Sequence, residues 1–230
     1  MASVDNHLLE VFPATVRARV RAACEPVHLE LAQILSEPGE ATHYVYFPVD
    51  SFVSLVALVE GSPGVEVGMV GREGMLGAHL ALGIARAPLH ALVQGEGKAW
   101  RMSATAFRRE LRRSPVMQQA MNRYLYVLMA QQSAAAACLR FHLTGQRLAR
   151  WLLMSQDRAH SNQFHVTHEF LAYMLGMRRV GITTAASALQ RDGLIDYHRG
   201  DVTVIDRKGL EAAACSCYAT DQRTYAERLL

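Results

Sequence analysis

The chain has 230 residues, of which 50% are hydrophobic, and a formal net charge of +3. This length is enough for one large domain or two small ones with a buried core. The most apolar segment, residues 124–130, is far shorter than the roughly 20 residues of a membrane span. The composition therefore excludes a membrane-spanning protein and favours a globular one.

The N-terminal segment MASVDNHLLEVFPATVRARVRAACEPV lacks the apolar core and small-residue cleavage site of a secretory signal. We therefore expect a cytoplasmic protein in a reducing compartment. The four cysteines, Cys24, Cys138, Cys215 and Cys217, form no CxxC pair, so the sequence predicts no zinc site of the usual kind. We interpret the CxC at Cys215 and Cys217 as two ordinary thiols on a terminal segment, although adjacent thiols can also bind metal or sense oxidants.

The positive charge is concentrated in one part of the chain. Residues 140–210 carry ten Lys and Arg against six Asp and Glu, whereas residues 1–139 carry twelve of each. A local excess of four cations fits contact with a polyanion.

The first third of the chain changes from a helical pattern to a strand pattern. Residues 14–36 mix polar and apolar side chains as a helix does. From Pro38-Gly39-Glu40 onward the chain is rich in Val, Tyr and Phe, and the turn residues Gly61-Ser62-Pro63-Gly64 predict a hairpin within 44–70.

Two further strands are predicted at residues 89–94 and 98–102, separated by a Gly-rich turn. Short strands at close spacing indicate a β-roll or sandwich. Ser103 is then expected to cap the N-terminus of a short helix over 104–112.

A long helix is predicted from Pro115 to Leu139, because no other proline and no glycine interrupts this segment. Apolar residues alternate at spacings of four and three, which is a heptad seam. A second stripe (Val116, Ala120, Val127, Ala130 and Ala134) indicates two partners, the roll and a second copy of the helix, although a single helix buried in a larger core is the alternative. The predicted dimer contacts are Met117, Met121, Tyr124, Leu128, Gln131, Ala135 and Cys138.

Beyond residue 143 the chain becomes helical again, with Leu148, Trp151, Leu152 and Ser155 on one face. Thr167 is expected to cap a helix over 168–175, which Gly176 ends. A second helix over 179–191 follows, with Ile182, Ala185, Ala186 and Leu189 on its apolar face. Two short helices joined by a glycine-containing turn predict a helix-turn-helix.

The opposite face of the second helix carries Arg179, Val180, Thr183, Thr184 and Ser187. Arginine there can donate two hydrogen bonds to guanine, and threonine can reach phosphate or a thymine methyl group. Arg178, at the start of the helix, is expected to contact a phosphate group of the DNA backbone. Gly181 costs about 1 kcal/mol of helix propensity and would let the backbone approach DNA or the first helix closely.

The segment GLIDYHRGDVTVID, residues 193–206, predicts a hairpin that follows the second helix as a wing, with Arg199 at its tip near the phosphate backbone. Helix, turn, helix and wing with cations on one side indicate DNA binding. An ordinary helical domain with solvated arginines is the alternative.

These motifs resemble the Crp/Fnr family of bacterial transcription regulators over about residues 30–210. The resemblance rests on Pro38-Gly39-Glu40, VGREGMLG (70–77), the long helix, RLARWLL (147–153), VTHEFLAYMLGMRR (166–179) and LQRDGLIDYHRGDVTVID (189–206). It implies an α+β fold with an N-terminal double-stranded β-helix (jelly-roll) sensor domain, a long dimerisation helix and a C-terminal winged helix-turn-helix. The implied boundaries are residues 1–113, 114–142 and 143–230.

The resemblance also implies roles for residues of the helix-turn-helix. Arg179 matches the first arginine of the family's recognition helix, whereas Val180 and Thr184 replace its glutamate and second arginine. Thr167 matches a phosphate contact. The expected DNA-binding set is Thr167, His168, Arg178, Arg179, Val180, Thr183, Thr184, Ser187 and Arg199.

In the sensor half this chain departs from relatives that bind cyclic AMP. Where those relatives have a Gly-Glu pair, this chain has Gly77-Ala78, so the carboxylate is missing. Where they have Arg-Ser or Arg-Thr, this chain has Arg86-Ala87, so the hydroxyl is missing. The candidate ligand residues are Gly77, Ala78, Arg86, Ala87, Gln132 and Ser133. We predict no cofactor. We expect a small effector other than cyclic AMP, such as another small anion that Arg86 could meet, or none, and a cyclic nucleotide is the disfavoured alternative.

The resemblance implies a homodimer on an inverted-repeat DNA operator, with RNA polymerase as a further candidate partner, no membrane association and no enzymatic activity. A signal would pass from the roll through the dimer helix and a hinge near Phe141 to Thr144.

An iron–sulfur cluster is disfavoured because only Cys24 lies near the N-terminus, and a haem would need an axial ligand such as His79. One alternative is a metal enzyme on the double-stranded β-helix, although His43, His79 and His90 do not form the HxH pattern of such sites. The other is a ligand-binding module that acts without DNA.

Overall fold

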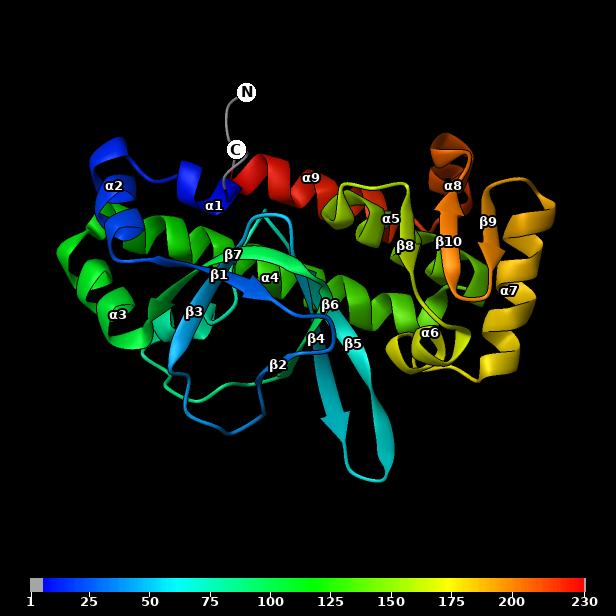
Figure 1. The fold of residues 1–230 in the computed structure, drawn as a ribbon, viewed down its shortest axis with the longest axis horizontal. Helices are drawn as coiled ribbons and strands as arrows, with labels where there is room; N and C mark the ends of the chain where they lie inside the picture. The colour runs from blue at the N-terminus through cyan, green and yellow to red at the C-terminus, as the bar shows by residue number, and fades with distance from the viewer. Residues whose placement is uncertain (1–5, 230) are drawn as a thin grey trace. The chain divides into compact units, whose positions relative to one another are not determined.

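A computed structural model describes residues 6–229 and divides them into two compact units. The first unit contains residues 6–55, 69–129 and 224–229, and the second contains residues 56–68 and 130–223. Figure 1 traces the elements along the chain. The predicted domain boundaries stay a proposal, because the units divide within the long helix rather than at its ends, and residues 1–5 and 230 lie outside the described part.

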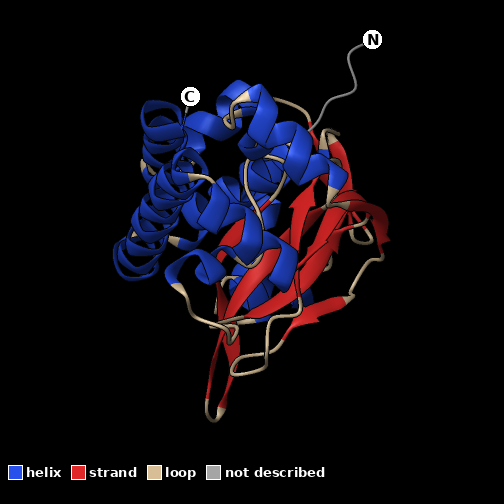
Figure 2. Ribbon diagram, turned by 90° about the vertical axis from the view of Figure 1, so that its left-hand side faces the viewer, coloured by secondary structure: helices blue, strands red, loops and turns tan. Residues whose placement is uncertain are grey.

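The sensor half contains two sheets, and Figure 2 draws these and all other strands in red. The first has the strand order β1-β7-β3, and the second has the order β2-β6-β4-β5. The pairings of β7 with β1 and β3 are antiparallel, with Glu25 opposite Arg101 and Tyr44 opposite Ser103. The strands are β1 (Glu25–Leu29), β2 (Ile34–Ser36), β3 (Tyr44–Pro48), β4 (Phe52–Val59), β5 (Ser62–Val70), β6 (His90–Gly95) and β7 (Gly97–Ser103).

This arrangement confirms the predicted mixed fold with a β-sandwich sensor. The hairpin within 44–70 forms between β4 and β5, and the strands at 89–94 and 98–102 appear as β6 and β7.

The predicted helix over residues 14–36 is wrong beyond residue 22. Helix α2 (Ala14–Ala22) ends there, and β1 and β2 occupy the remainder. Pro26 removes a backbone donor and disfavours helical geometry at the residue before it. Strand pairing with β7 supplies the backbone hydrogen bonds instead.

Helices pack into the core of the sensor unit. Leu8, Phe12, Phe47, Phe107 and Met117 are at most 2% exposed and belong to one apolar cluster. The helical elements here are α1 (His7–Glu10), α2, the 3-10 helix η1 (Ala78–Leu82), α3 (Ala104–Arg113) and α4 (Pro115–Phe141). Ser103 caps α3 as predicted, since its side chain accepts a hydrogen bond from the Ala106 backbone N–H.

The C-terminal half forms a winged helix-turn-helix. A three-stranded antiparallel sheet has the order β8-β10-β9. Its elements are α5 (Thr144–Ala159), β8 (Gln163–His165), α6 (His168–Met174), α7 (Arg179–Arg191), β9 (Ile195–His198), β10 (Asp201–Val204), α8 (Arg207–Ala213) and α9 (Cys217–Leu229). None of the helices between residues 6 and 229 has the length and apolar character needed to cross a bilayer.

Candidate nucleic-acid interface, sensor cavity and cysteine cluster

The turn between α6 and α7 is built from local backbone contacts. Thr167 Oγ1 accepts a hydrogen bond from the Phe170 N–H at 3.1 Å and caps α6 as predicted. Gly176 has φ +60°, the left-handed conformation that ends a helix at low cost for glycine. The Met177 N–H then bonds to the Ala172 carbonyl at 2.8 Å, which fixes the direction in which α7 begins.

Helix α7 has one buried and one exposed face, as its periodicity predicts. Its buried residues are Ile182, Ala185, Ala186 and Leu189. Its exposed residues include Arg179, Val180, Thr183, Thr184 and Ser187, with Arg178 exposed immediately before the helix. A Cβ added at Gly181 would meet no atom within 4 Å, so close packing against α6 does not explain this glycine.

Two threonines of α7 donate their hydroxyl protons within the helix. Thr184 Oγ1 bonds to the Val180 carbonyl at 3.0 Å, and Thr183 Oγ1 bonds to the Arg179 carbonyl at 3.1 Å. Thr183 Oγ1 also lies 3.1 Å from Nδ1 of His168, which links α7 to α6. Burial lowers the pKa of His168, and the nearby Arg179 guanidinium lowers it further. Thr184 itself is exposed.

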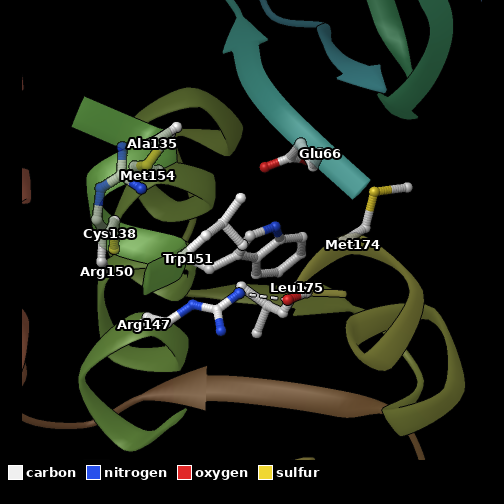
Figure 3. A pocket seen from close by; sticks show the side chains of 10 residues that line it. Glu66, Ala135, Cys138, Arg147, Arg150, Trp151, Met154, Met174 and Leu175 are labelled. Carbon is white, nitrogen blue, oxygen red and sulfur yellow. Dashed lines mark hydrogen bonds between the residues drawn. The ribbon is translucent and has the colours of Figure 1, made fainter. Parts of the chain in front are cut away.

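A buried arginine of α5 holds the end of α6. Arg147, which is 8% exposed, donates a hydrogen bond from Nη2 to the backbone carbonyl of Leu175 (Figure 3). The last carbonyls of a helix have no partner within the helix, so this contact satisfies one of them. Burial lowers the pKa of Arg147.

A small cavity lies beside this contact and is lined by Trp151, Arg150 and Cys138, among others (Figure 3). Its volume of about 30 Å³ is enough for one or two water molecules and too small for a metabolite. Among the described residues that line this cavity, the Trp151 Nε1 and Arg150 Nε groups are buried without a hydrogen-bond partner. Water in the cavity would satisfy such donors.

The wing places its cation at the tip of the hairpin. Arg199 is exposed and adopts φ +52°, and it joins β9 to β10. The Val166 N–H bonds to the Gly200 carbonyl at 2.7 Å, so the wing is tied to the segment that leads into α6.

The sensor unit contains a cavity of about 360 Å³. Its polar lining residues include Glu40, Thr42, His43 and His79. Thr42 Oγ1 lies 2.8 Å from His79 Nε2, and burial lowers the pKa of His79, with a smaller contribution from Arg108. No lysine or arginine is among the described residues that line this cavity.

The structure separates the candidate ligand residues. Gly77 lines the cavity with φ +92°, and a Cβ there would lie 2.9 Å from Val45 Cγ1. Arg86 instead donates a hydrogen bond to the Gly39 carbonyl at 2.6 Å and does not line the cavity. Ala78 and Ala87 are buried but are not lining residues, and Gln132 and Ser133 are exposed on α4.

The predicted dimer seam lies largely inside one chain. Met117, Met121 and Tyr124 are at most 2% exposed and pack in the sensor core, where Tyr124 Oη accepts a hydrogen bond from the Met75 N–H at 2.9 Å. Ala135 and Cys138 are also buried, and Leu128 and Gln131 are half-buried. A heptad spacing predicts a buried helix face, but it does not predict whether that face packs against the same chain or against a second copy.

The opposite face of α4 is the exposed one. Tyr126 is 53% exposed and Met129 is 66% exposed, and the small residues Ser133 and Ala136 continue the same line at spacings of four and three.

Three of the four cysteines come together with a histidine within the second unit. Cys138 and His142 lie at the end of α4, and Cys215 and Cys217 lie at the start of α9. Cys215 is 4% exposed and Cys217 is 8% exposed, so both thiols are buried, and their interpretation as ordinary thiols stays a prediction. A hydrogen bond between Cys138 and Cys215 raises the pKa of the Cys138 thiol and lowers the pKa of Cys215 to about 5.

The helix-turn-helix matches a known family. Residues 146–213 match the model of the Crp-like helix-turn-helix domain. None of the curated protein sequences matches the chain.

The whole chain resembles solved structures at low sequence identity. A chain described as a transcriptional regulator of the Crp/Fnr family from Eubacterium rectale has a TM-score of 0.70 at 16% identity, covering 91% of this chain and 99% of that one. FixK2 from Bradyrhizobium japonicum has a TM-score of 0.71 at 13% identity, covering 84% and 98%. The c-di-GMP-responsive global regulator CLP from Xanthomonas campestris has a TM-score of 0.67 at 18% identity, covering 84% and 99%.

The fold and the matched domain define a DNA-binding transcription regulator. Its helix-turn-helix is Crp-like and its overall fold is that of the Crp/Fnr regulators, which confirms the resemblance predicted from the sequence.

Proposed function

We propose that the protein is a homodimeric, sequence-specific regulator that lays the exposed face of α7 in the major groove of DNA. One observation carries this proposal. The residues that periodicity assigns to DNA, from Arg178 to Ser187, are exposed, while the intervening apolar residues are buried beneath them. In this proposal Arg179 reads a base, Val180, Thr183, Thr184 and Ser187 contact base edges or the backbone, and Thr167, Arg178 and Arg199 lie along the phosphates. His168, which the sequence assigned to DNA, supports this face instead, because its Nδ1 lies 3.1 Å from Thr183 Oγ1 and its Nε2 is buried.

The dimer would form through the exposed face of α4 rather than through the buried seam. Tyr126, Met129, Ser133 and Ala136 follow the spacing of a two-stranded coiled coil. Apolar side chains exposed in a row along a helix favour pairing with a second copy. Two recognition helices related by a two-fold axis would then read an inverted repeat.

The experiment that tests this function is selection of bound duplexes from random-sequence DNA with the full-length protein. We expect an inverted repeat whose half-sites are centred about 10 base pairs, or one helical turn, apart or a multiple of that. Recovery of unrelated sequences after repeated rounds would contradict the proposal.

The sensor would respond to a small ligand other than cyclic AMP, or to none. Glu40, His43 and His79 are among the lining residues of the cavity, and the only arginine of the expected phosphate site, Arg86, is bonded to a backbone carbonyl. A phosphate group in this cavity would have no lysine or arginine among the described lining residues to balance its charge. It would lie near the negative charge of Glu40 and would lose its hydration. A neutral or cationic polar ligand suits the lining better.

Calorimetric titration tests this part of the proposal. We expect cyclic AMP and cyclic GMP to show no binding tighter than about 1 mM and to leave the affinity for the selected duplex unchanged. Micromolar binding of either nucleotide would show that the missing carboxylate and hydroxyl are replaced by other groups.

A further inference from the structure

The cysteine cluster brings ligand atoms from two distant segments to one point. Cys138 and His142 are four residues apart, so they lie on one side of the last turn of α4. Cys215 approaches from the segment between α8 and α9, and Cys217 is the first residue of α9. The three sulfur atoms and one imidazole nitrogen all lie within 4.8 Å of one another.

The separations are those of a mononuclear tetrahedral site. Zinc bonds of about 2.3 Å to sulfur and 2.0–2.1 Å to nitrogen require edges of about 3.8 Å between sulfurs and about 3.6 Å between sulfur and nitrogen. The Sγ atoms of Cys138 and Cys215 are 3.4 Å apart, and Cys217 Sγ is 3.6 Å from Nδ1 of His142. Only small side-chain shifts would bring the four atoms to equal distances from one ion.

The chemical nature of these four ligand side chains indicates which kind of metal ion they would bind. Three thiols, one imidazole and no carboxylate suit a soft or borderline ion, and four protein ligands fill a tetrahedron. A closed site of this kind is structural, because it leaves no position open for water or substrate. Burial of the three cysteines keeps the site away from solvent.

A disulfide explains less of the arrangement. It would join Cys138 to Cys215, but it would leave Cys217 and His142 in the same cluster without a role. The convergence of the third thiol and the imidazole on this pair is the observation that favours a metal ion. The expected reducing compartment also disfavours a stable disulfide.

We propose that Cys138, His142, Cys215 and Cys217 bind one zinc ion that joins the end of α4 to the start of α9. Both segments border the winged helix-turn-helix in the chain, and the residues after Phe141 form the proposed hinge. The ion would therefore hold the C-terminal segment to the helix end that leads into the DNA-binding half. This proposal does not depend on DNA binding.

The test is the metal content of the full-length protein purified under reducing conditions without added metal or chelator. We expect about one zinc ion per chain. We expect the same content in Cys24→Ser, because Cys24 lies in the sensor unit outside the cluster. Cys215→Ser and Cys217→Ser should lose most of the zinc, because serine is a poor replacement for a thiolate ligand.

Cobalt replacement keeps the test decisive if the serine variants fail to fold. Reduced, metal-free wild-type protein titrated with Co²⁺ should develop the intense thiolate-to-cobalt absorption of a tetrahedral site, saturating at about one ion per chain. The proposal is overturned by absence of both zinc and this absorption, by iron with sulfide in place of zinc, or by full zinc retention in both variants.

Discussion

At the scale of single residues, Arg179 is the side chain on which base recognition depends in this account. It is exposed at the first position of α7, where a guanidinium can donate two parallel hydrogen bonds to guanine. Replacing Arg179 by alanine should weaken binding to the selected duplex by about 1–3 kcal/mol and relax the preference at one base pair of each half-site. Competition binding with single-base variants of the duplex measures both effects.

Arg191 is the matched control, because it is an exposed arginine at the other end of the same helix. Arg191→Ala removes the same charge and should leave the base preference intact. If Arg179→Ala weakens all sequences equally, Arg179 contacts phosphate and another residue reads the bases.

The sequence predicts which residues of α7 are buried, because burial follows helical periodicity. It does not predict contacts that depend on tertiary packing. The bond from Arg147 to the Leu175 carbonyl joins residues of two different helices, and only the motif RLARWLL indicated that this segment is special. The cysteine cluster was missed for the same reason. The spacing of Cys138 and His142 was an available signal, but the CxC begins 73 positions after His142.

At the scale of elements, the sequence predicted helices and turns well where caps and glycines mark their ends. The helix over 179–191 and the helix that Thr167 caps are examples. The region from 23 to 36 was assigned to a helix because its strands are short and Leu29 alone among their residues is buried, so they show little alternation. Long-range pairing with β7 decides the structure there.

The long helix α4 provides a prediction at this scale. Met129→Glu places a charge in the middle of the exposed face, where pairing with a second copy would bury it at a cost of several kcal/mol. We expect self-association to weaken at least tenfold, or about 1.4 kcal/mol, by analytical ultracentrifugation.

Leu82→Glu is the control for this change, because Leu82 is 62% exposed but lies on η1 in the sensor unit. It should leave self-association unchanged. A fully dimeric Met129→Glu protein would place the dimer interface elsewhere.

At the scale of the whole molecule, the order of sensor, long helix and winged helix-turn-helix could be predicted because each part has its own local signature. The identity of the partner of α4 could not, since an apolar stripe is the same whether it meets the roll or a second chain. The structure assigns Met117, Met121 and Tyr124 to the core of one chain, whereas Tyr126 and Met129 are exposed, and we propose that the second copy contacts this exposed face.

The central claim is that two copies of α7 read a specific inverted repeat, and the affinity ratio between selected and scrambled duplexes tests it most directly. Full-length protein at physiological salt should bind the selected duplex at least about 10³-fold more tightly than a scrambled duplex of equal length and composition. Equal affinity for the two duplexes would contradict the account, because binding would then rest on phosphate contacts alone.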